Sequence, residues 1–244
     1  MLEYYSTEKT VSVNEVDASS NLSWFAIMQI LQNLATSHAD QNGYGRDNIV
    51  AKDNAFWVIT KMRFKATNLP KTNDVIKAET WPISPGKIVL ERDFRLSLNG
   101  ISFLEATSEW CLLDIDTSRP KRTAGTSVDN GNEYINERVE TPAFIREKVE
   151  VSGLDFVYER IIRSSDIDVN GHTNNAKYTQ MVTDAFSVDF LRQNRVAEYQ
   201  ITFNNQSYQG DALAIYKKQI SEKRYYLTAI SNDKTIFTTH IKFA

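Results

Sequence analysis

Cysteine and histidine are scarce in this chain. Cys111 is the single cysteine among 244 residues, which excludes an intrachain disulfide and any metal site built from cysteines alone. The three histidines, His38, His172 and His240, leave little material for a zinc cluster. We therefore expect no bound metal.

Long apolar runs and a strong excess of one charge are also lacking. No stretch approaches the roughly 20 apolar residues that span a bilayer, and residues 1–10 lack the basic and apolar regions of a signal peptide. The net charge of -3 and the pI near 5.7 give no bulk attraction to nucleic acid or to anionic membranes. We expect a cytoplasmic protein with no membrane span and no nucleic-acid partner.

Glycine and proline are few, and the remaining pattern is written twice. Apolar residues recur at three and four residues over 22–38, which predicts a helix, and Gly43 and Gly45 follow it. Period-two segments then predict antiparallel strands up to about residue 120. A polar stretch over 121–150 is typical of a linker. A second helix is predicted over 175–193, again followed by strands.

The two halves align without a gap around the starts of their helices. Residues 15–32 laid on 166–183 pair Asp17 with Asp168. Because both halves share one order of helix and strands, a duplication explains the match better than chance does. Two antiparallel sheets, each wrapping a long helix, can pair into a larger sheet that removes an exposed edge.

The most distinctive polar motif lies where the second helix should begin. Asp168, Asn170 and His172 fall within five residues of "DVNGHTNNAKY". An ionised carboxylate can activate water or attack a carbonyl directly, and the residues leave both roles open for Asp168. An amide and an imidazole can polarise a carbonyl or move a proton. Capping a helix is the simpler role for such residues, with Thr173 or Asn174 as the N-cap.

The chain resembles the acyl-ACP thioesterases, in a bacterial type related to the plant fatty acyl-ACP thioesterases. The resemblance rests on "DVNGHTNNAKY", "FWVITKMRF", "ETW", "ATSEWCLLDIDTSRPKR" and residues 16–45. It implies an α+β fold, the tandem (double) hotdog. The implied domains are an N-terminal hotdog with the acyl-chain pocket (1–120), a linker (121–150) and a C-terminal hotdog with the catalytic motif (151–244).

The resemblance implies a cofactor-free thioester hydrolase that releases free fatty acid from acyl-acyl carrier protein and so ends fatty acid synthesis. Its partners would be acyl carrier protein, with its acyl-phosphopantetheine, and the fatty acyl chain. Two alternatives stay open: an acyl-CoA thioesterase, and a non-catalytic acyl-binding hotdog protein. Whether two chains form a homodimer through their outer sheet edges also stays open.

The resemblance also assigns residues. Asp168, Asn170 and His172 would be catalytic; Asn174, Asn175, Gln206, Trp24 and Met28 would bind substrate. The first half keeps Asp17 but has Ser19 and Asn21 opposite Asn170 and His172, which favours one active site per chain.

One position departs from the family pattern. Many relatives have a Glu about 34 residues after the site histidine, where this chain has Gln206 and Ser207. Neither side chain can act as a general base. The expected surface for the acidic carrier protein needs cations, and the candidates are Lys177, the alternation Lys61, Arg63 and Lys65, and the pair Lys217 and Lys218.

Overall fold

A single antiparallel sheet of ten strands forms the body of the protein. The computed structural model describes residues 4–129, 134–146 and 151–244. The strand order is β1-β3-β4-β5-β2-β7-β10-β9-β8-β6. The first-half strands are β1 Tyr5–Thr10, β2 Ala55–Ala66, β3 Val75–Pro82, β4 Leu90–Leu98 and β5 Ile101–Asp114. The second-half strands are β6 Asp155–Ile161, β7 Val196–Phe203, β8 Ala212–Ser221, β9 Arg224–Ser231 and β10 Lys234–Phe243.

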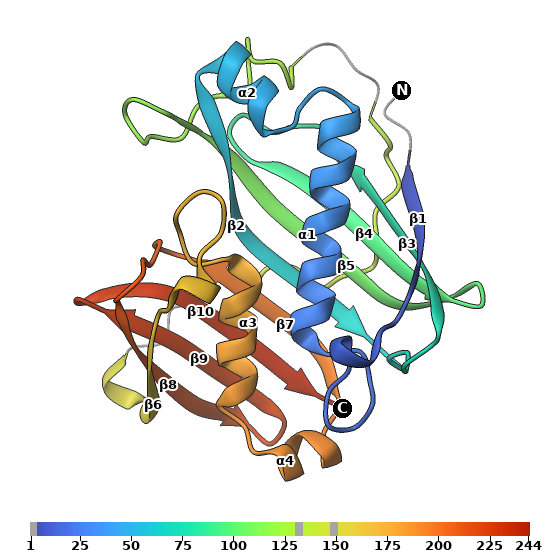
Figure 1. Cartoon of the computed structure of the whole chain (residues 1–244), viewed down its shortest axis with the longest axis vertical. Helices are drawn as coiled ribbons and strands as arrows, with labels where there is room; N and C mark the ends of the chain where they lie inside the picture. Colours follow the sequence, from blue (N-terminus) through green and yellow to red (C-terminus); the bar gives the residue numbers. More distant parts are fainter. Residues whose placement is uncertain (1–3, 130–133, 147–150) are drawn as a thin grey trace.

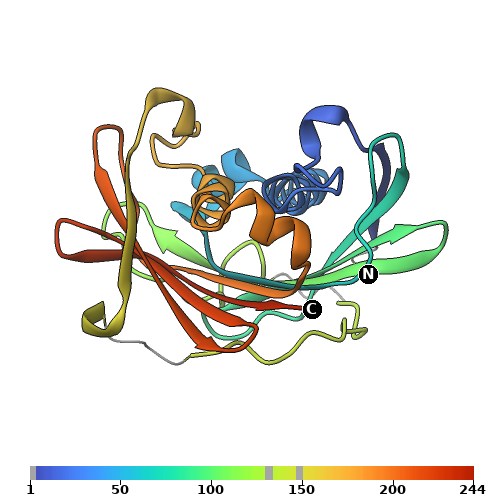
Figure 2. The same ribbon diagram turned by 90° about the horizontal axis from the view of Figure 1, so that it is seen from below.

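Helices cover one face of this sheet, as Figures 1 and 2 show. They are α1 Trp24–Gln41, α2 Arg46–Asp53, α3 Asn175–Asp184 and α4 Val188–Gln193, with the short 3₁₀ turns η1 Val13–Glu15, η2 Val151–Gly153 and η3 Ser164–Asp166. The order β1-η1-α1-α2-β2 to β5 is repeated as β6-η3-α3-α4-β7 to β10. The predicted duplication and the tandem hotdog architecture are therefore confirmed. None of the described helices is long and apolar enough to cross a membrane.

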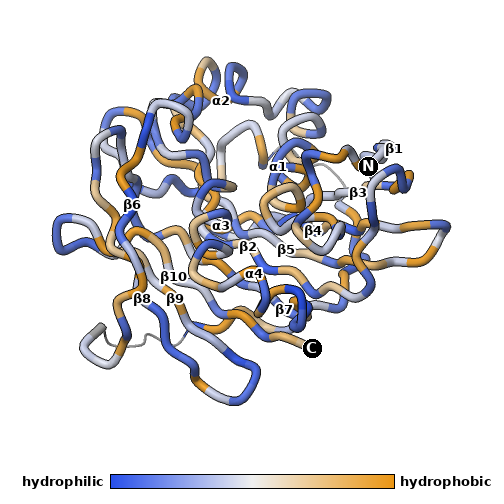
Figure 3. The backbone as a smooth tube through the Cα atoms, turned by 60° about the horizontal axis from the view of Figure 1, so that its bottom comes forward, coloured by the Kyte–Doolittle hydropathy of each residue, from blue (hydrophilic) through white to orange (hydrophobic). Residues whose placement is uncertain are grey.

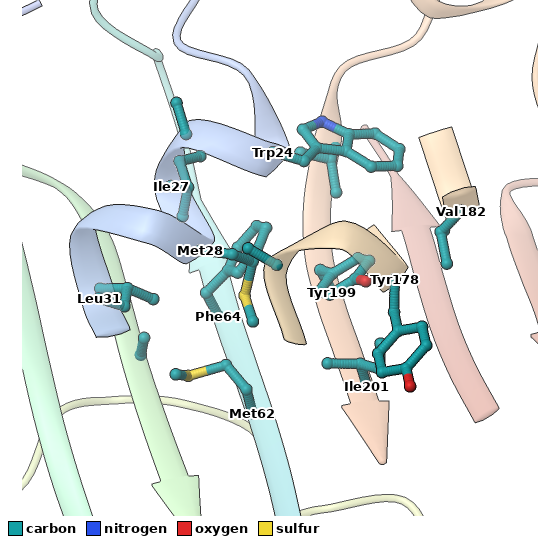
Figure 4. Close-up of a cluster of buried hydrophobic side chains, with 14 of the residues drawn as sticks. Trp24, Ile27, Met28, Leu31, Met62, Phe64, Tyr178, Val182, Tyr199 and Ile201 are labelled. Carbon is teal, nitrogen blue, oxygen red and sulfur yellow. The ribbon is translucent and has the colours of Figure 1, made fainter. Parts of the chain in front are cut away.

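The two halves join where β2 pairs with β7, from Lys61 opposite Thr202 to Lys65 opposite Glu198. Side chains alternate across β2, so Met62 and Phe64 are buried toward the helices while Lys65 is exposed. α1 and α3 lie side by side over this junction. One apolar core runs through both halves beneath them (Figure 4). Figure 3 shows hydrophilic residues gathered in several loops at the rim of the sheet.

The first helix was predicted nearly correctly and the second was not. Ser23 caps α1 by accepting the N–H of Ala26, and the helix ends before Gly43, whose φ is +76°. The prediction of one helix over 175–193 is wrong, because α3 ends at Asp184 and α4 begins after Ser187. Ser187 accepts the N–H of Phe190 and starts the new helix. The break allows Phe186 to pack into the core against Trp24.

The described part of the predicted linker forms a strap on the sheet face opposite the helices (Figure 2). Residues 134–146 contain no helix or strand, yet their backbone is held at several points. The N–H of Val139 donates to Oδ2 of buried Asp93 at 3.1 Å. The side chain of Gln200 pairs with both the N–H and the C=O of Ile145 at 2.8 Å. The strap thus contacts both halves, and the boundaries 1–120, 121–150 and 151–244 stay a prediction.

Candidate active site

Asp168, Asn170 and His172 lie in one tight turn between η3 and α3, as their spacing predicts. Backbone pairing between Ile167 and Thr173 closes the turn. Inside it, the N–H of Asp168 donates to the His172 carbonyl at 2.8 Å, and the N–H of Gly171 donates to the Asp168 carbonyl at 3.0 Å. Gly171 has a φ of +79°, a conformation that glycine adopts without steric cost. The turn therefore brings the acid, the amide and the imidazole together.

The carboxylate of Asp168 is only partly engaged. Its Oδ1 accepts the backbone N–H of Asn170 at 2.8 Å, an Asx-turn bond. Oδ2 has no hydrogen-bond partner among the residues that the structure describes. The side chain is half-buried. One oxygen thus shapes the turn and the other is available for chemistry.

A second acid, Asp166, is buried beside this turn and holds it in place. The side chain of Asp166 is 1% exposed, and its Oδ1 accepts from the Arg160 guanidinium at 2.7 Å. Its Oδ2 accepts the N–H of Arg163 at 3.0 Å, and Lys177 Nζ lies 3.8 Å from Oδ1. Two cations beside a desolvated carboxylate offset the cost of burying it. The loop before Asp168 is therefore held to both β6 and α3.

The start of α3 is held by a small network of buried hydroxyls. Thr173 Oγ1 lies 2.7 Å from Ser207 Oγ, which lies 2.9 Å from the hydroxyl of Tyr178. Burial raises the pKa of Tyr178, so this phenol stays protonated at neutral pH. Ser207 is fully buried in this network, where its hydroxyl links Thr173 to Tyr178 at the start of α3.

Asn174 and Asn175 occupy the first positions of α3. The Asn174 side chain accepts the N–H of Ala176 at 2.9 Å and is the N-cap. Asn175 is the first helical residue and is half-buried. Its backbone N–H makes no hydrogen bond within the described residues, as expected for the first turn of a helix. A free donor at the positive end of the helix dipole therefore lies three residues from His172.

Tyr208 contacts both His172 and Gln206. The ring of Tyr208 meets the His172 ring edge to face, with centroids 5.2 Å apart. The Tyr208 hydroxyl donates to Gln206 Oε1 at 3.2 Å. Gln206 is exposed. The sequence pattern contained no signal for Tyr208, which is an isolated aromatic residue in a polar loop.

A second residue that sequence reasoning missed comes from the other half of the chain. Arg46, the first residue of α2, donates from Nε to Asn170 Oδ1 at 3.2 Å. The two residues are 124 positions apart, and Arg46 belongs to no motif. The pairing of the two halves through β2 and β7 brings α2 near this turn.

The same turn exists in the first half with different side chains. The N–H of Asp17 donates to the Asn21 carbonyl at 2.8 Å, and its Oδ1 accepts the N–H of Ser19 at 2.8 Å. Ser20 has a φ of +61° where Gly171 has +79°. These bonds have counterparts at Asp168 and confirm the predicted gapless alignment. Asp17 differs in one respect, because its Oδ1 also accepts the N–H of Asn21 at 3.1 Å. The acid belongs to the repeated fold, while the first copy has Ser19 at the position of Asn170 and Asn21 at the position of His172.

Trp24 and Met28 lie in the core between α1 and α3 (Figure 4). Trp24 is 6% exposed and packs against Tyr199 and Phe243, and Met28 is fully buried. A cavity of about 330 Å³ lies elsewhere along α1, toward β1, where it is lined by Ile30, Leu34 and the ion pair of Lys9 with Glu15 among others. Neither Trp24 nor Met28 lines this cavity.

The expected cationic surface is partly covered. The ring of Phe144, in the strap, lies against two cations. Its centroid is 4.4 Å from the guanidinium carbon of Arg63 and 5.4 Å from Lys61 Nζ. The strap thus covers part of Lys61 and Arg63, whereas Lys65 is exposed. A surface for the carrier protein among these cations stays a prediction. Lys217 lies over Phe186 at 4.6 Å, and burial lowers its pKa.

The described part of the chain contains neither a cluster of metal ligands nor an exposed thiol. Within residues 4–129, 134–146 and 151–244, no group of three or more His, Cys, Asp or Glu side chains could hold a metal ion. Cys111 lies buried in β5, where burial raises the pKa of its thiol. A raised pKa keeps the thiol protonated and poorly nucleophilic.

Comparison with known proteins gives one consistent family. Residues 3–129 match the family model described as the acyl-ACP thioesterase N-terminal domain, and residues 154–244 match that of the C-terminal domain. The chain is 24% identical over 206 residues to a chloroplastic acyl-[acyl-carrier-protein] hydrolase of Cuphea viscosissima. It is 25% identical over 227 residues to a chloroplastic oleoyl-acyl carrier protein thioesterase of Arabidopsis thaliana.

The alignments cover 79% and 86% of this chain but only 48% and 62% of those two relatives, so the chain spans about half of their length. Among solved structures, an acyl-ACP thioesterase from Bacteroides thetaiotaomicron superposes with a TM-score of 0.89 at 23% identity, covering 99% of this chain and 98% of that one. A 12:0-ACP thioesterase from Umbellularia californica superposes with a TM-score of 0.88 at 18% identity, covering 99% and 97%. At these identities the likeness establishes the fold.

Proposed function

The chain belongs to the acyl-ACP thioesterase family, and on this premise we propose that it hydrolyses acyl-acyl carrier protein and releases a free fatty acid. The observation that carries the proposal is the contrast between the two copies of one turn. In both copies Oδ1 of the acid accepts the backbone N–H two residues further on, and only the second copy has Asn170 and His172 in the turn. A purely structural turn needs neither side chain, as the first copy demonstrates.

Asp168 has the central role in the proposed reaction. Its Oδ2 either takes a proton from water as that water attacks the thioester carbonyl, or attacks the carbonyl itself and forms an anhydride that water then cleaves. In both routes the C–S bond breaks, and the pantetheine sulfur leaves as a thiol after gaining a proton. His172 is the proposed carrier of that proton, because it is the titratable imidazole of the turn.

The developing oxyanion needs hydrogen-bond donors. Asn170 supplies a side-chain amide, and the free backbone N–H of Asn175 adds a donor at the start of α3. A single such donor in other enzymes stabilises the transition state by about 3 to 4 kcal/mol. Asn174, as the N-cap, keeps this helix start in place. Gln206 has an amide in the place of the family Glu and would orient water through its N–H groups.

We place the acyl chain against α1, with Trp24 and Met28 as lining residues. Support comes from their position, since Trp24 contacts Phe186 of the second half and Met28 faces the junction of the two sheets. Because both are packed, an acyl chain must displace core contacts to enter. If they line its path, Met28→Ala moves the chain-length preference toward longer acyl groups, measured with a panel of acyl chains.

The proposal is tested by fatty acid release from acyl-ACPs of increasing chain length, with the matching acyl-CoAs beside them. Release from acyl-ACP, with much lower rates on acyl-CoA, is the expected result. Equal rates on both carriers would contradict recognition of the carrier protein. No release from any substrate, with acyl chains still bound, would identify an acyl-binding protein and overturn the hydrolase.

A further inference from the structure

We propose that Arg46, contributed by the first half, is a positioning residue that fixes which way the amide of Asn170 faces. This inference rests on the hydrolase activity proposed above. It makes the site a joint product of both halves, because the motif in the second half lacks the residue that orients its own amide.

The contact determines the orientation of the amide. A guanidinium carries only donors, so the atom that meets Arg46 Nε at 3.2 Å must be the carbonyl oxygen of Asn170. The backbone N–H of Asn170 is already bound to Asp168 Oδ1 at 2.8 Å. With both of these groups engaged, the NH₂ of Asn170 points away from Arg46 and remains free to donate. A thioester carbonyl needs that donor.

Without Arg46 the amide would lose this bias. Rotation of an asparagine amide by about half a turn is roughly two-fold degenerate, so oxygen and nitrogen would exchange places freely. An oxygen turned toward the substrate would repel the developing oxyanion. Arg46 therefore acts through Asn170 and need not touch the reacting atoms.

The helix that carries Arg46 is firmly anchored. Ile49 on the same helix is fully buried against Leu112 and Val128. Gly45 precedes the helix close to the end of α1. An added Cβ would lie 1.9 Å from Asp40 Oδ1 and 3.1 Å from the Asp40 Cα, so a side chain there would require Asp40 to move. Such an anchor lets an exposed arginine present its guanidinium from a defined point.

The second half does not reproduce this arrangement. By element order α4 corresponds to α2, and α4 begins at Val188, whose side chain has no donor. The turn of the first half has Ser19 and Asn21 where the second has Asn170 and His172. The helix that corresponds to α2 lacks a guanidinium at its start. The imidazole of His172, the amide of Asn170 and the guanidinium of Arg46 thus occur together at the turn of the second half.

Arg46→Ala tests the proposal, with Arg195→Ala as its matched control. Arg195 also joins the two halves through an asparagine oxygen, donating from Nη1 to Asn68 Oδ1 at 2.9 Å, but both residues lie outside the turn. We expect Arg46→Ala to lower kcat about tenfold, a modest part of what one oxyanion donor supplies, and Arg195→Ala to leave kcat unchanged. In an Asn170→Ala background, Arg46→Ala should add no further loss.

An alternative role for Arg46 is to bind the phosphate of the phosphopantetheine arm of acyl-ACP, because its side chain is 61% exposed. The variants are therefore assayed on acyl-ACP and on acyl-N-acetylcysteamine thioesters, which lack the phosphate. Positioning predicts the same fold-loss in kcat on both substrates. A rise in KM confined to acyl-ACP, or a kcat unchanged by Arg46→Ala, would overturn the proposal.

A spectroscopic measurement separates this proposal from the proposed function. In protein labelled with ¹⁵N-asparagine, the side-chain NH₂ signals of Asn170 should shift in Arg46→Ala and stay in place in Arg195→Ala. Unshifted Asn170 signals would refute the orienting contact whether or not the enzyme is active. An inactive wild type with a shifted Asn170 signal would refute the hydrolase alone.

Discussion

At the scale of residues, Asp17 and Asp168 occupy the same turn but differ in detail. Oδ1 of Asp17 accepts two backbone N–H groups, and Oδ1 of Asp168 accepts that of Asn170. Each closes its turn through Oδ1, so the presence of an acid there does not indicate catalysis. Asn170 and His172 distinguish the second turn from the first, and their catalytic roles stay a prediction. Arg46 and Tyr208 could not be predicted, because their contacts with the motif depend on how distant segments meet.

His38 makes stability depend on pH. It is buried in α1, with Nδ1 2.9 Å from a guanidinium nitrogen of Arg92. Burial, and then the charge of Arg92, lower its pKa from 6.5 to about 4. Since the unfolded chain binds this proton at higher pH than the folded protein does, the stabilisation is complete above pH 6.5 and is lost as the pH falls toward 4.

The prediction is that wild type loses more stability than His38→Gln between pH 6.5 and 4, by on the order of 2 to 3 kcal/mol. Glutamine keeps an acceptor for Arg92 but does not titrate. Urea unfolding at several pH values measures the difference. The same pH dependence in both proteins would show that His38 is protonated freely in the folded state.

At the scale of elements, the sequence predicted where both long helices begin and failed on where the second one ends. Starts depend on local caps, and Ser23 and Asn174 both act as caps. The break at 185–187 combines a local cap, Ser187, with the packing of Phe186 against Trp24, a tertiary contact that the sequence pattern does not show. The fold class was predicted because the duplicated order of elements extends over the whole chain.

The start of α3 supplies a prediction about Asn174. Asn174→Ala should lower the free energy of unfolding by about 1 kcal/mol, since the N–H of Ala176 loses its acceptor. Asn174→Ser should restore most of it, because serine caps α1 at the corresponding position. Any increase in KM that persists in Asn174→Ser measures a contact of the amide with substrate. If serine were as destabilising as alanine, the capping role would be wrong.

At the scale of the whole molecule, the junction of β2 with β7 joins the two halves into one sheet, and we expect them to unfold as one cooperative unit. The apolar core is continuous across them, and α1 packs on α3. The strap adds contacts with both halves through Asp93 and Gln200. The sequence indicated only a linker there, because single polar residues that contact a distant strand leave no periodic pattern.

Cooperative unfolding can be tested with the natural tryptophans. All four, Trp24, Trp57, Trp81 and Trp110, lie in the first half, whereas circular dichroism reports both halves. We expect the two signals to give one midpoint in urea, as a two-state transition requires. Separate midpoints, or a biphasic dichroism curve, would mean that the halves unfold independently.

The most direct test of the central claim compares Asp168→Ala with Asp17→Ala, two equivalent substitutions in the two copies of one turn. Fatty acid release from acyl-ACP is measured for both beside wild type and His172→Ala. Asp168→Ala and His172→Ala should each lose at least about 100-fold in kcat, while Asp17→Ala should stay near wild type apart from reduced stability. Equal losses from Asp168→Ala and Asp17→Ala would show that the turn matters only for folding, and hydrolysis would then lie elsewhere.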